Sequence, residues 1–522
     1  MSAPDAAPGG AAPPLLRMRG IRKTFGPVVA LKDVDFTVGP REVHGLLGGN
    51  GAGKTTLMNV LYGLYAPDAG TIEIDGAPVV IASPKDAIAA GVGMVHQTFL
   101  QVDVFTVAEN VVLGTDTSGV DVNGRIRELS ERFGLAVDPA ARIGDLPVGV
   151  RQRVEILKAL YRGAKILVLD EPTTNLTPQE VDALFGSMRA IVDEGMSVVL
   201  ITHKIRETMA ACDRMTIMRD GAWIATVDAA DTSPEDLAAR MVGAAPASDE
   251  TADVALGGTE IGDATLDVPE VTGPVRVVGS RLTVPGTGGK AVVEDVSIEL
   301  CEGEILGIAG VAGNGQVELA ETLTGCRPAH GSLTLDGTEL VGRPTEAWLR
   351  AGVVYVPEDR QRDGILPGAD ITENLVLGAH RTRAKAGLID WGRARREAVE
   401  AISEFAVKTP SAATACGQLS GGNIQRVILA RAFAHNPKML LLHNPTRGLD
   451  IASTQFVYDR IRAAAAGGCS VIVISEDLDD EVIALADRIR VAYSGRLVGD
   501  FARGHADPYE LGRLMTGVSG AA

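Results

Sequence analysis

Residues 48–56 read GGNGAGKTT, a glycine-rich stretch that contains Lys54 and Thr55. The stretch follows an apolar run, VHGLLG at 43–48, and leads into a segment of helical character, TLMNVLYGL at 56–64. A strand, a glycine-rich turn and a helix in this order form a phosphate-binding loop, because the glycines let backbone N–H groups turn inward and the helix N-terminus adds its dipole. In such a loop the lysine reaches the β- and γ-phosphates and the threonine hydroxyl ligates Mg²⁺.

Two later strand ends supply the groups that hydrolysis needs. The apolar run ILVLD at 166–170 ends in Asp170, and Glu171 follows at once. A carboxylate at 170 can hold Mg²⁺ through water, and its neighbour can orient or deprotonate the attacking water. The run VVLITH at 198–203 ends in His203. We expect this imidazole to contact the γ-phosphate and to link it to Glu171.

The glycine-rich stretch belongs to an internal repeat, and a repeat of this kind indicates that the chain contains two similar structural units. Five landmarks recur in the same order: GGNGAGKTT at 48–56 with GVAGNGQVE at 310–318, VGMVHQ at 92–97 with VVYVPE at 353–358, LPVG at 146–149 with LSGG at 419–422, ILVLDEPTTNLT at 166–177 with LLLHNPTRGLD at 440–450, and VVLITH at 198–203 with VIVISE at 471–476.

Each half alternates short Val/Ile/Leu runs with longer helical patterns, as buried parallel strands with crossover helices do. The sequence therefore predicts two tandem α/β domains, one over 15–243 and one over 273–518. Residues 1–14 are rich in Ala, Pro and Gly and predict a disordered tail. The intervening 244–272 predicts a solvated acidic linker, because residues 244–270 contain seven Asp or Glu and no Lys or Arg.

Composition limits the partners of the chain. Its 49 basic and 67 acidic residues give a net charge of −18, so no overall positive field holds it on nucleic acid or on an anionic bilayer. No stretch approaches the ~18 consecutive apolar residues of a membrane-spanning helix. The five cysteines lie far apart without a CxxC pair, which fits a reducing compartment. We expect a cytosolic protein that does not bind nucleic acid.

The ordered motifs resemble the ATPase subunits of ABC transporters, and the resemblance covers both halves. It assigns a P-loop to 48–55, a Q-loop to Gln97, a signature region to 146–153, a Walker B motif to 166–171, a D-loop to about 174–177 and an H-loop to His203. It implies two nucleotide-binding domains, each with a helical subdomain, that use ATP and Mg²⁺. Phe25 stands where the family places an aromatic residue that stacks on adenine, although an ordinary core residue is the alternative.

The two halves differ in their chemistry. The second half has none of the catalytic groups; in their places it carries Gln316, Val317, His443, Asn444 and Glu476. Losing the lysine charge and the metal contacts reduces phosphoryl transfer by orders of magnitude. The second half nevertheless keeps an intact signature, LSGGN at 419–423, whereas the first half reads LPVGV at 146–150.

In the family that the motifs resemble, two domains close head to tail, so each nucleotide lies between one P-loop and the other domain's signature. The resemblance therefore implies one complete composite site and one degenerate site, which could still bind a nucleotide as a structural wedge. We expect catalytic roles for Glu171, His203, Lys54 and Gln97, and metal contacts from Thr55, Gln97 and Asp170. The nucleotide-binding residues of the complete site would be Phe25, Gly48, Gly49, Asn50, Gly51, Ala52, Gly53, Lys54, Thr55 and Thr56 of the first half with Ser420, Gly421, Gly422 and Asn423 of the second.

A transporter ATPase without a membrane segment needs separate membrane subunits. The resemblance thus implies two integral-membrane permease subunits, a location on the cytoplasmic face of the membrane, and indirectly an extracytoplasmic substrate-binding lipoprotein. PEDR at 357–360 and PTRGLD at 445–450 look like the importers of simple sugars and nucleosides. VGVRQRVEILKALYRGA at 148–164 and GVAGNGQVELAETLTG at 310–325 look most like the nucleoside importers.

Three alternatives remain beside nucleoside import. The first is the same role for simple sugars such as ribose or galactose. The second is a tandem ATPase that acts on ribosomes or DNA without a permease, which the acidic, aperiodic linker disfavours. The third is a regulator without hydrolysis, which the complete first site disfavours. At the second Q-loop position Glu358 replaces Gln, and we expect it either to pair with the neighbouring Arg360 or to lie in a solvated charged turn.

Overall fold

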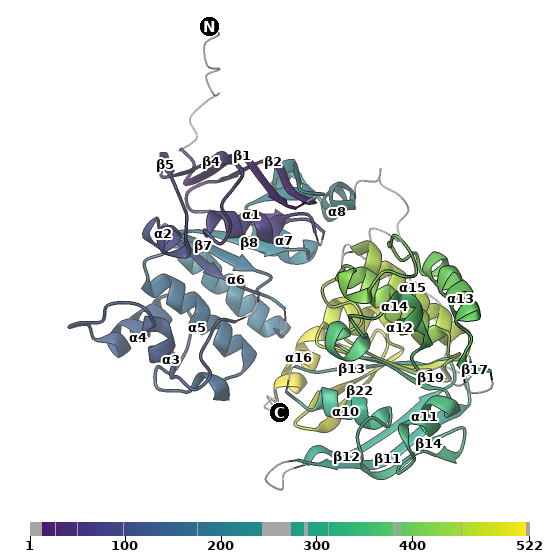
Figure 1. The fold of residues 1–522 in the computed structure, drawn as a ribbon. Helices are drawn as coiled ribbons and strands as arrows, with labels where there is room; N and C mark the ends of the chain where they lie inside the picture. Colours follow the sequence, from purple (N-terminus) through teal and green to yellow (C-terminus); the bar gives the residue numbers. More distant parts are fainter. Residues whose placement is uncertain are drawn as a thin grey trace. The chain divides into compact units, whose positions relative to one another are not determined.

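The structure is a computed structural model. It describes residues 13–26, 28–49, 51–97, 99–174, 176–242, 273–286, 291–311, 313–378, 384–385, 388–449 and 451–517. The chain divides into two compact units, Met1–Leu256 and Gly257–Ala522, which we call the first and the second unit (Figure 1). The predicted linker at 244–272 and all but two residues of the predicted tail lie outside the described ranges.

The first unit is built around a six-stranded sheet whose order is β10-β9-β3-β8-β7-β6. All neighbouring strands run parallel except β10, which is antiparallel to β9. The strands β3, β7 and β8 are buried along their whole length, which explains their continuous apolar sequences. The bounds are β3 (Val43–Leu47), β6 (Val92–Val95), β7 (Ile166–Asp170), β8 (Ser197–Thr202), β9 (Arg214–Arg219) and β10 (Ala222–Asp228).

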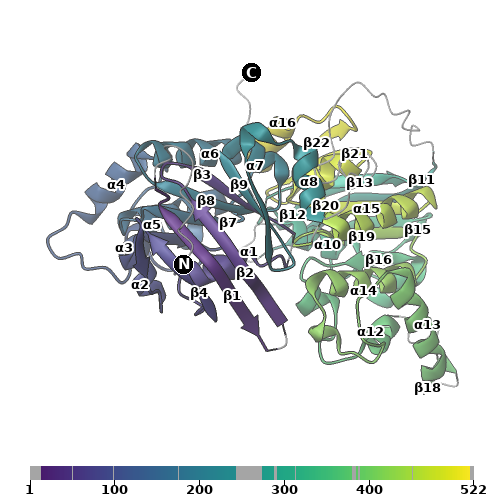
Figure 2. The ribbon, with the colours of Figure 1, turned by 90° about the horizontal axis from the view of Figure 1, so that it is seen from above.

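A second, antiparallel sheet of order β2-β1-β4-β5 accompanies the first, and the sequence did not predict it. Helix α1 (Lys54–Leu61) lies beside this sheet in Figure 1 and in Figure 2. The core joins both sheets, because Phe36 of β2, Leu57 of α1 and Val168 of β7 belong to one buried apolar cluster. The strands are β1 (Leu16–Phe25), β2 (Val28–Val38), β4 (Ala69–Ile74) and β5 (Ala77–Val79).

Three helices of the first unit form the predicted helical subdomain, to one side of the sheets (Figure 1). They are α3 (Val107–Val112), α4 (Val122–Arg132) and α5 (Val148–Tyr161), and both α3 and α4 pack on α5. The structure also describes α2 (Pro84–Ala89), α6 (Pro178–Asp193), α7 (Ile205–Ala211) and α8 (Pro234–Val242) in this unit.

The second unit repeats this plan. Its six-stranded sheet has the order β16-β19-β20-β13-β21-β22, and its four-stranded antiparallel sheet has the order β12-β11-β14-β15. The strands are β11 (Val275–Pro285), β12 (Ala291–Cys301), β13 (Ile305–Ala309), β14 (His330–Leu335), β15 (Thr338–Glu339), β16 (Val353–Val356), β19 (Met439–His443), β20 (Ser470–Ser475), β21 (Arg488–Tyr493) and β22 (Arg496–Ala502); a short hairpin adds β17 (Ala384–Lys385) and β18 (Leu388–Ile389).

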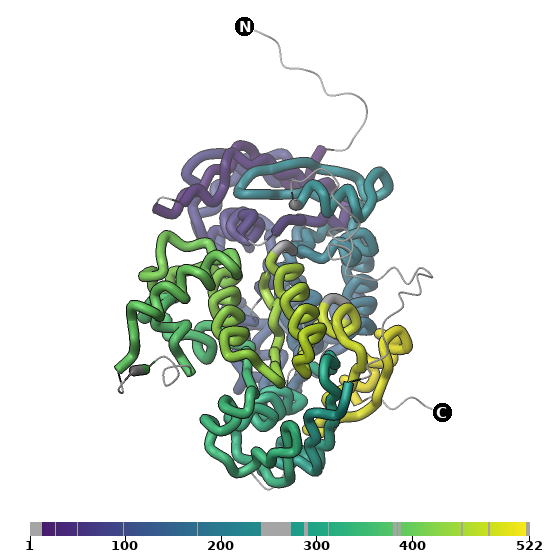
Figure 3. Tube along the Cα trace, turned by 90° about the vertical axis from the view of Figure 1, so that its right-hand side faces the viewer, coloured from purple at the N-terminus to yellow at the C-terminus, as the bar shows by residue number. Residues whose placement is uncertain are grey.

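The helical part of the second unit forms a green lobe in Figure 3, apart from the teal strands of the antiparallel sheet. It contains α12 (Ile371–Val376), α13 (Trp391–Glu404) and α14 (Gly421–Phe433). The other α-helices among the described residues of this unit are α10 (Gln316–Leu323), α11 (Thr345–Ala351), α15 (Ile451–Ala466) and α16 (Pro508–Thr516). Among the described residues of both units, no helix combines the length and the apolar character that crossing a membrane requires.

Candidate active site

The predicted phosphate loop connects β3 to α1. Gly53 caps α1 in a left-handed conformation with φ 98°, and a Cβ atom there would lie 2.8 Å from the carbonyl oxygen of Ala30. A Cβ atom on Gly48 would lie 2.4 Å from the carbonyl oxygen of Met218. Only glycine fits these two positions, so the backbone can turn tightly between the strand and the helix. Asn50 lies outside the described residues.

Lys54 is buried at the start of α1. Its Nζ donates hydrogen bonds to the carbonyl oxygens of Gly48, at 2.6 Å, and Gly49, at 3.2 Å. Burial lowers the pKa of this ammonium, and the carboxylates of Glu171 and Asp170 oppose the shift. Bound phosphate oxygens would supply the negative charge that the buried ammonium lacks.

Asp170 is the last residue of β7 and is buried. Burial raises the pKa of this carboxyl to about 6, the charge of Glu171 adds to the rise, and a hydrogen bond with Thr55 opposes it. A carboxylate next to a hydroxyl is an oxygen donor set that Mg²⁺ prefers, and a cation would relieve the cost of the buried charge. The two residues therefore fit the metal that the sequence predicted.

Glu171 receives two hydrogen bonds from elements far apart in the sequence. Its Oε1 lies 3.0 Å from Nδ1 of His203, and its Oε2 accepts from Nε2 of Gln97 at 3.0 Å. Burial raises the pKa of Glu171, but His203, Lys54 and Lys204 outweigh it, so the pKa is lowered overall. The carboxylate stays ionised near neutral pH and is able to accept a proton from water.

The backbone of Glu171 is also unusual. Its φ of 47° lies in the left-handed region, and its N–H donates to the carbonyl oxygen of Ile201 on β8 at 2.9 Å. Asn444, at the matching place of the second unit, has φ 45° and the same kind of bond to Ile474 on β20. This turn redirects the side chain at the end of the strand.

A cavity of about 640 Å³ opens beside this cluster. Thr55, Gln97 and Asp170 line one part of it, and side chains of α2 and α5 line another part. The apolar residues Leu64 and Leu100 also line it and are substantially exposed.

Phe25 ends β1 and is 42% exposed. Its ring lies 5.1 Å from the ring of Tyr65 in an edge-on arrangement, and Nζ of Lys23 lies 5.6 Å from its centre. The exposed ring is available to a stacking base, and it is not a core residue. Tyr65 is a neighbour that the sequence analysis missed; an aromatic residue shortly after the loop helix was the only signal.

The first unit thus brings together six predicted residues, while Phe25 lies on a separate hairpin. The clustered residues are Lys54, Thr55, Gln97, Asp170, Glu171 and His203.

The corresponding loop of the second unit connects β13 to α10. Gln316, in the place of Lys54, is buried; its Nε2 donates to the carbonyl oxygen of Val311 at 2.7 Å, and its Oε1 accepts from N–H of Asn314 at 3.1 Å. The neighbouring Val317 is 44% exposed. A neutral amide and an apolar side chain therefore replace the ammonium and the hydroxyl.

His443 and Glu358 stand where the first unit has Asp170 and Gln97. Glu358 forms an ion pair with Arg447, and its Oε2 lies 3.8 Å from Nε2 of His443. The predicted pairing of Glu358 with Arg360 is wrong. Glu358 pairs with Arg447 because β16 and β19 are neighbours, which brings the segments after them together. Arg360 instead donates to the carbonyl oxygen of Gly421 at 3.4 Å.

The signature of the second unit begins α14. Ser420 is the N-cap residue, and its Oγ accepts from Nδ2 of Asn423 at 2.8 Å. The Oδ1 of Asn423 accepts from N–H of Lys408 at 2.7 Å. The asparagine therefore holds the serine hydroxyl at the helix N-terminus, where backbone N–H groups are free for an anion.

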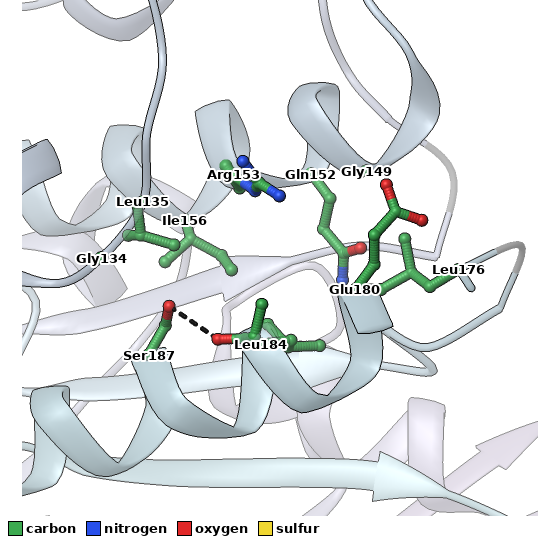
Figure 4. A pocket seen from close by; sticks show the side chains of 11 residues that line it. Gly134, Leu135, Gly149, Gln152, Arg153, Ile156, Leu176, Glu180, Leu184 and Ser187 are labelled. Atoms are coloured by element: carbon green, nitrogen blue, oxygen red, sulfur yellow. Dashed lines mark hydrogen bonds between the residues drawn. The ribbon is translucent and has the colours of Figure 1, made fainter. Parts of the chain in front are cut away.

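The altered signature of the first unit begins α5, where Pro147 replaces the serine as N-cap. Figure 4 shows the adjoining pocket, in which Glu180 of α6 extends toward Gly149. A Cβ atom on Gly149 would lie 2.3 Å from Oε1 of Glu180. The pocket holds about 20 Å³, which accommodates little more than one water molecule.

The family described as "ABC transporter" matches this chain twice, over residues 31–174 and 293–447. Both matches include a glycine-rich loop, a signature and the strand that ends in Asp170 or His443. The chain belongs to the ABC transporter family. It is an ATPase whose hydrolysis is coupled to transport, and the expectations of two nucleotide-binding domains and of ATP as ligand are confirmed.

Relatives of known function match nearly the full length. The chain is 40% identical to the glucose import ATP-binding protein TsgD13 of Haloferax volcanii, over 97% of this chain and 96% of the relative. It is 39% identical to the guanosine import ATP-binding protein NupO of Bacillus subtilis, over 96% and 97%. It is also 39% identical to the nucleoside import ATP-binding protein NupA of Lactococcus lactis, over 96% and 98%.

Proposed function

We propose that this ABC ATPase energises the import of nucleosides through separate permease subunits, with one competent ATP site per chain. The observation that carries the single ATP site is the paired contact of Glu171 with His203 and Gln97 beside Lys54 and Asp170. The second unit has no counterpart of this arrangement among its described residues.

In the proposed reaction Lys54 and the backbone of the loop bind the β- and γ-phosphates. Glu171 orients the attacking water and accepts its proton, and His203 holds the carboxylate in place while it contacts the γ-phosphate. Thr55, Asp170 and Gln97 would hold Mg²⁺, which supplies charge neutralisation for the phosphates. Phe25 stacks on the adenine ring.

The composite arrangement is proposed from the sequence asymmetry. Ser420 to Asn423 of the second unit would face the γ-phosphate bound by the first unit. The held Ser420 hydroxyl and the free N–H groups of α14 support this role. The acidic stretch 244–272 would link the domain at 15–243 to the domain at 273–518.

The permease partners and the place at the membrane are proposed from the family. The cavity next to Gln97 supports a contact with a permease, because its exposed apolar rim at Leu64 and Leu100 suits an apolar partner segment. We infer two permease subunits, a peripheral position on the cytoplasmic face, and an extracytoplasmic binding lipoprotein that acts through them.

Nucleosides are proposed as cargo because two of the relatives at 39% identity are named for guanosine and nucleoside import. A sugar is the second candidate, because the relative at 40% identity is named for glucose import. Identities of 39% and 40% differ by too little to decide between the two cargoes.

Uptake separates the two candidates. Cells that lack this chain are complemented with the wild type or with Glu171→Gln, and uptake of labelled guanosine, uridine, glucose and ribose is measured. We expect nucleoside uptake alone to be lost and to return only with the wild type. If sugar uptake alone is lost, the cargo is a sugar and not a nucleoside. If Glu171→Gln restores uptake, the single-site mechanism is overturned.

A further inference from the structure

We infer that the loop of the second unit binds no nucleoside triphosphate, so that each chain holds one ATP and not two. The inference goes beyond the proposed function, which assigns catalysis to the first unit and leaves open what the second loop binds. It rests on the proposed function for the one ATP that is bound.

The second loop is braced from inside its own unit. Asn314 stands where the first unit has Ala52, and its side chain makes two bonds that an alanine cannot make. Its Nδ2 donates to the carbonyl oxygen of Met515 on α16 at 3.0 Å, and its Oδ1 accepts from N–H of Ser494 at 3.1 Å. These bonds tie the loop to the last helix and to the turn between β21 and β22.

The side chain of Gln316 turns back onto its own loop. A phosphate loop binds its ligand with inward N–H groups. Here the N–H of Asn314 donates to Oε1 of Gln316, and the other end of that amide bonds to Val311. The matching N–H of the first unit, that of Ala52, is also bonded, to the carbonyl oxygen of Gly49 at 3.1 Å. The two loops therefore differ in the residue at 316, whose neutral amide brings no positive charge to compensate a triphosphate.

Two carboxylates of the second unit follow the end of β20. Glu476 takes the place of His203, and Glu481 is 2% exposed nearby. Each has one carboxylate oxygen that is buried without a hydrogen-bond partner among the described residues. Burial raises the pKa of both to about 7, so negative charge is already costly there before a ligand adds more.

Two arginines lie near these carboxylates: Arg447 opposes the rise in the pKa of Glu476, and Glu481 opposes the fall in the pKa of Arg360. Arg447 is engaged in the ion pair with Glu358. His443, in the place of the metal-binding Asp170, is 3% exposed, and burial lowers its pKa, which favours the neutral ring. A neutral imidazole is a poor substitute for a carboxylate as a ligand of Mg²⁺, which prefers oxygen donors.

A negatively charged side chain also lies beside the altered signature of the first unit. In the second unit a Cβ atom on the signature residue Gly422 would lie 3.4 Å from the neutral hydroxyl oxygen of Ser453. At the matching place of the first unit, Gly149 neighbours the carboxylate of Glu180 (Figure 4). The altered signature of the first unit thus packs against a carboxylate, where the intact signature of the second unit packs against a hydroxyl.

The number of bound nucleotides tests the inference. The full-length Glu171→Gln variant is saturated with radiolabelled ATP and Mg²⁺ in equilibrium dialysis, and the bound ATP per chain is counted. We expect one. A count of two overturns the inference and leaves the proposed function intact, whereas a count of zero overturns the proposed function together with the stoichiometry.

Matched variants of the two loops assign the bound ATP to a unit. Lys54→Ala in the Glu171→Gln background is expected to remove saturable binding, while Gln316→Ala is expected to leave the count at one with an unchanged Kd. Circular dichroism and a single elution volume confirm that each variant is folded. ATP that remains bound to the folded Lys54→Ala variant, or ATP lost in the folded Gln316→Ala variant, overturns the inference.

Discussion

His203 and Glu171 follow neighbouring strands and form a hydrogen-bonded pair, with 3.0 Å between Nδ1 of the imidazole and Oε1 of the carboxylate. For His203, burial lowers the pKa, but Glu171 outweighs it and the pKa is raised overall. For Glu171, burial raises the pKa and His203 leads the groups that lower it overall. Each residue therefore favours the charged form of the other.

Replacing the base should stop turnover without preventing binding. Glu171→Gln keeps the size of the side chain but cannot accept a proton, so we expect kcat to fall by about 10²–10⁴-fold, the range for loss of a general base. Phosphate release measures kcat. Glu476→Gln, the isosteric change in the second unit, is the control and is expected to leave kcat within about 2-fold of the wild type.

Replacing His203 should change the pH dependence. Without the imidazole, Glu171 loses the largest of the effects that lower its pKa, so its pKa rises. The acidic limb of the kcat profile is then expected to move to higher pH in His203→Gln. Measuring kcat between pH 5 and 9 tests this shift, and an unmoved limb with a uniformly lower kcat would contradict it.

Asp170 should destabilise the protein that has no nucleotide bound. Because its pKa is raised from 3.8 to about 6, the folded state binds more protons than the unfolded state between these values, and stability falls as pH rises through them. Asp170→Asn removes this cost, which is about 3 kcal/mol at most for a shift of about two units.

Denaturant unfolding of the nucleotide-free wild type and Asp170→Asn measures that difference. We expect Asp170→Asn to be more stable at pH 7.5, the gain to shrink as pH falls from 6 toward 4, and ATPase activity to be lost. Equal stability at all pH values would show that the burial of Asp170 costs nothing.

Phe25 should affect ATP binding more than catalysis. Loss of a stacking contact costs about 1 kcal/mol, so Phe25→Ala is expected to raise the KM for ATP roughly 5-fold with kcat nearly unchanged. Steady-state kinetics measure both constants. Phe25→Trp keeps an aromatic face and should retain the low KM. An unchanged KM in Phe25→Ala would show that Phe25 does not contact the nucleotide.

Asn314 should stabilise the second unit. Asn314→Ala leaves the N–H of Ser494 and the carbonyl of Met515 without their partner, and we expect a loss of about 1–3 kcal/mol. Hydrogen exchange of α16 should increase while exchange in α8 of the first unit stays unchanged. Unaltered exchange in α16 would contradict a bracing role.

The sequence predicted the buried strands and showed which candidate site residues lie close together. The runs that form β7 and β8 are apolar along their length. A polar residue directly after such a run lies at the carboxyl ends of the parallel strands. Asp170, Glu171 and His203 could therefore be placed together from the sequence alone. The glycine-rich turn before Lys54 allowed the phosphate loop to be located from the sequence as well.

The antiparallel sheets and several contacts were not predictable in this way. In β1 the alternation of buried and exposed residues is broken by register shifts between Arg19 and Arg22, so no clear period of two appears. The partner of Glu358 depends on strand order and not on sequence neighbours, and Arg447 becomes visible only when β16 and β19 lie side by side. Tyr65 and Glu180 likewise gain their importance from tertiary packing.

The left-handed backbone at Glu171 determines which substitutions there are informative. Asn tolerates this conformation with little strain, as Asn444 shows in the second unit, whereas β-branched residues such as Val and Ile do not. A complete set of substitutions at 171 would therefore separate into two groups. Gln and Asn would report on proton transfer in an intact fold, and the β-branched residues would report on whether the turn itself can form.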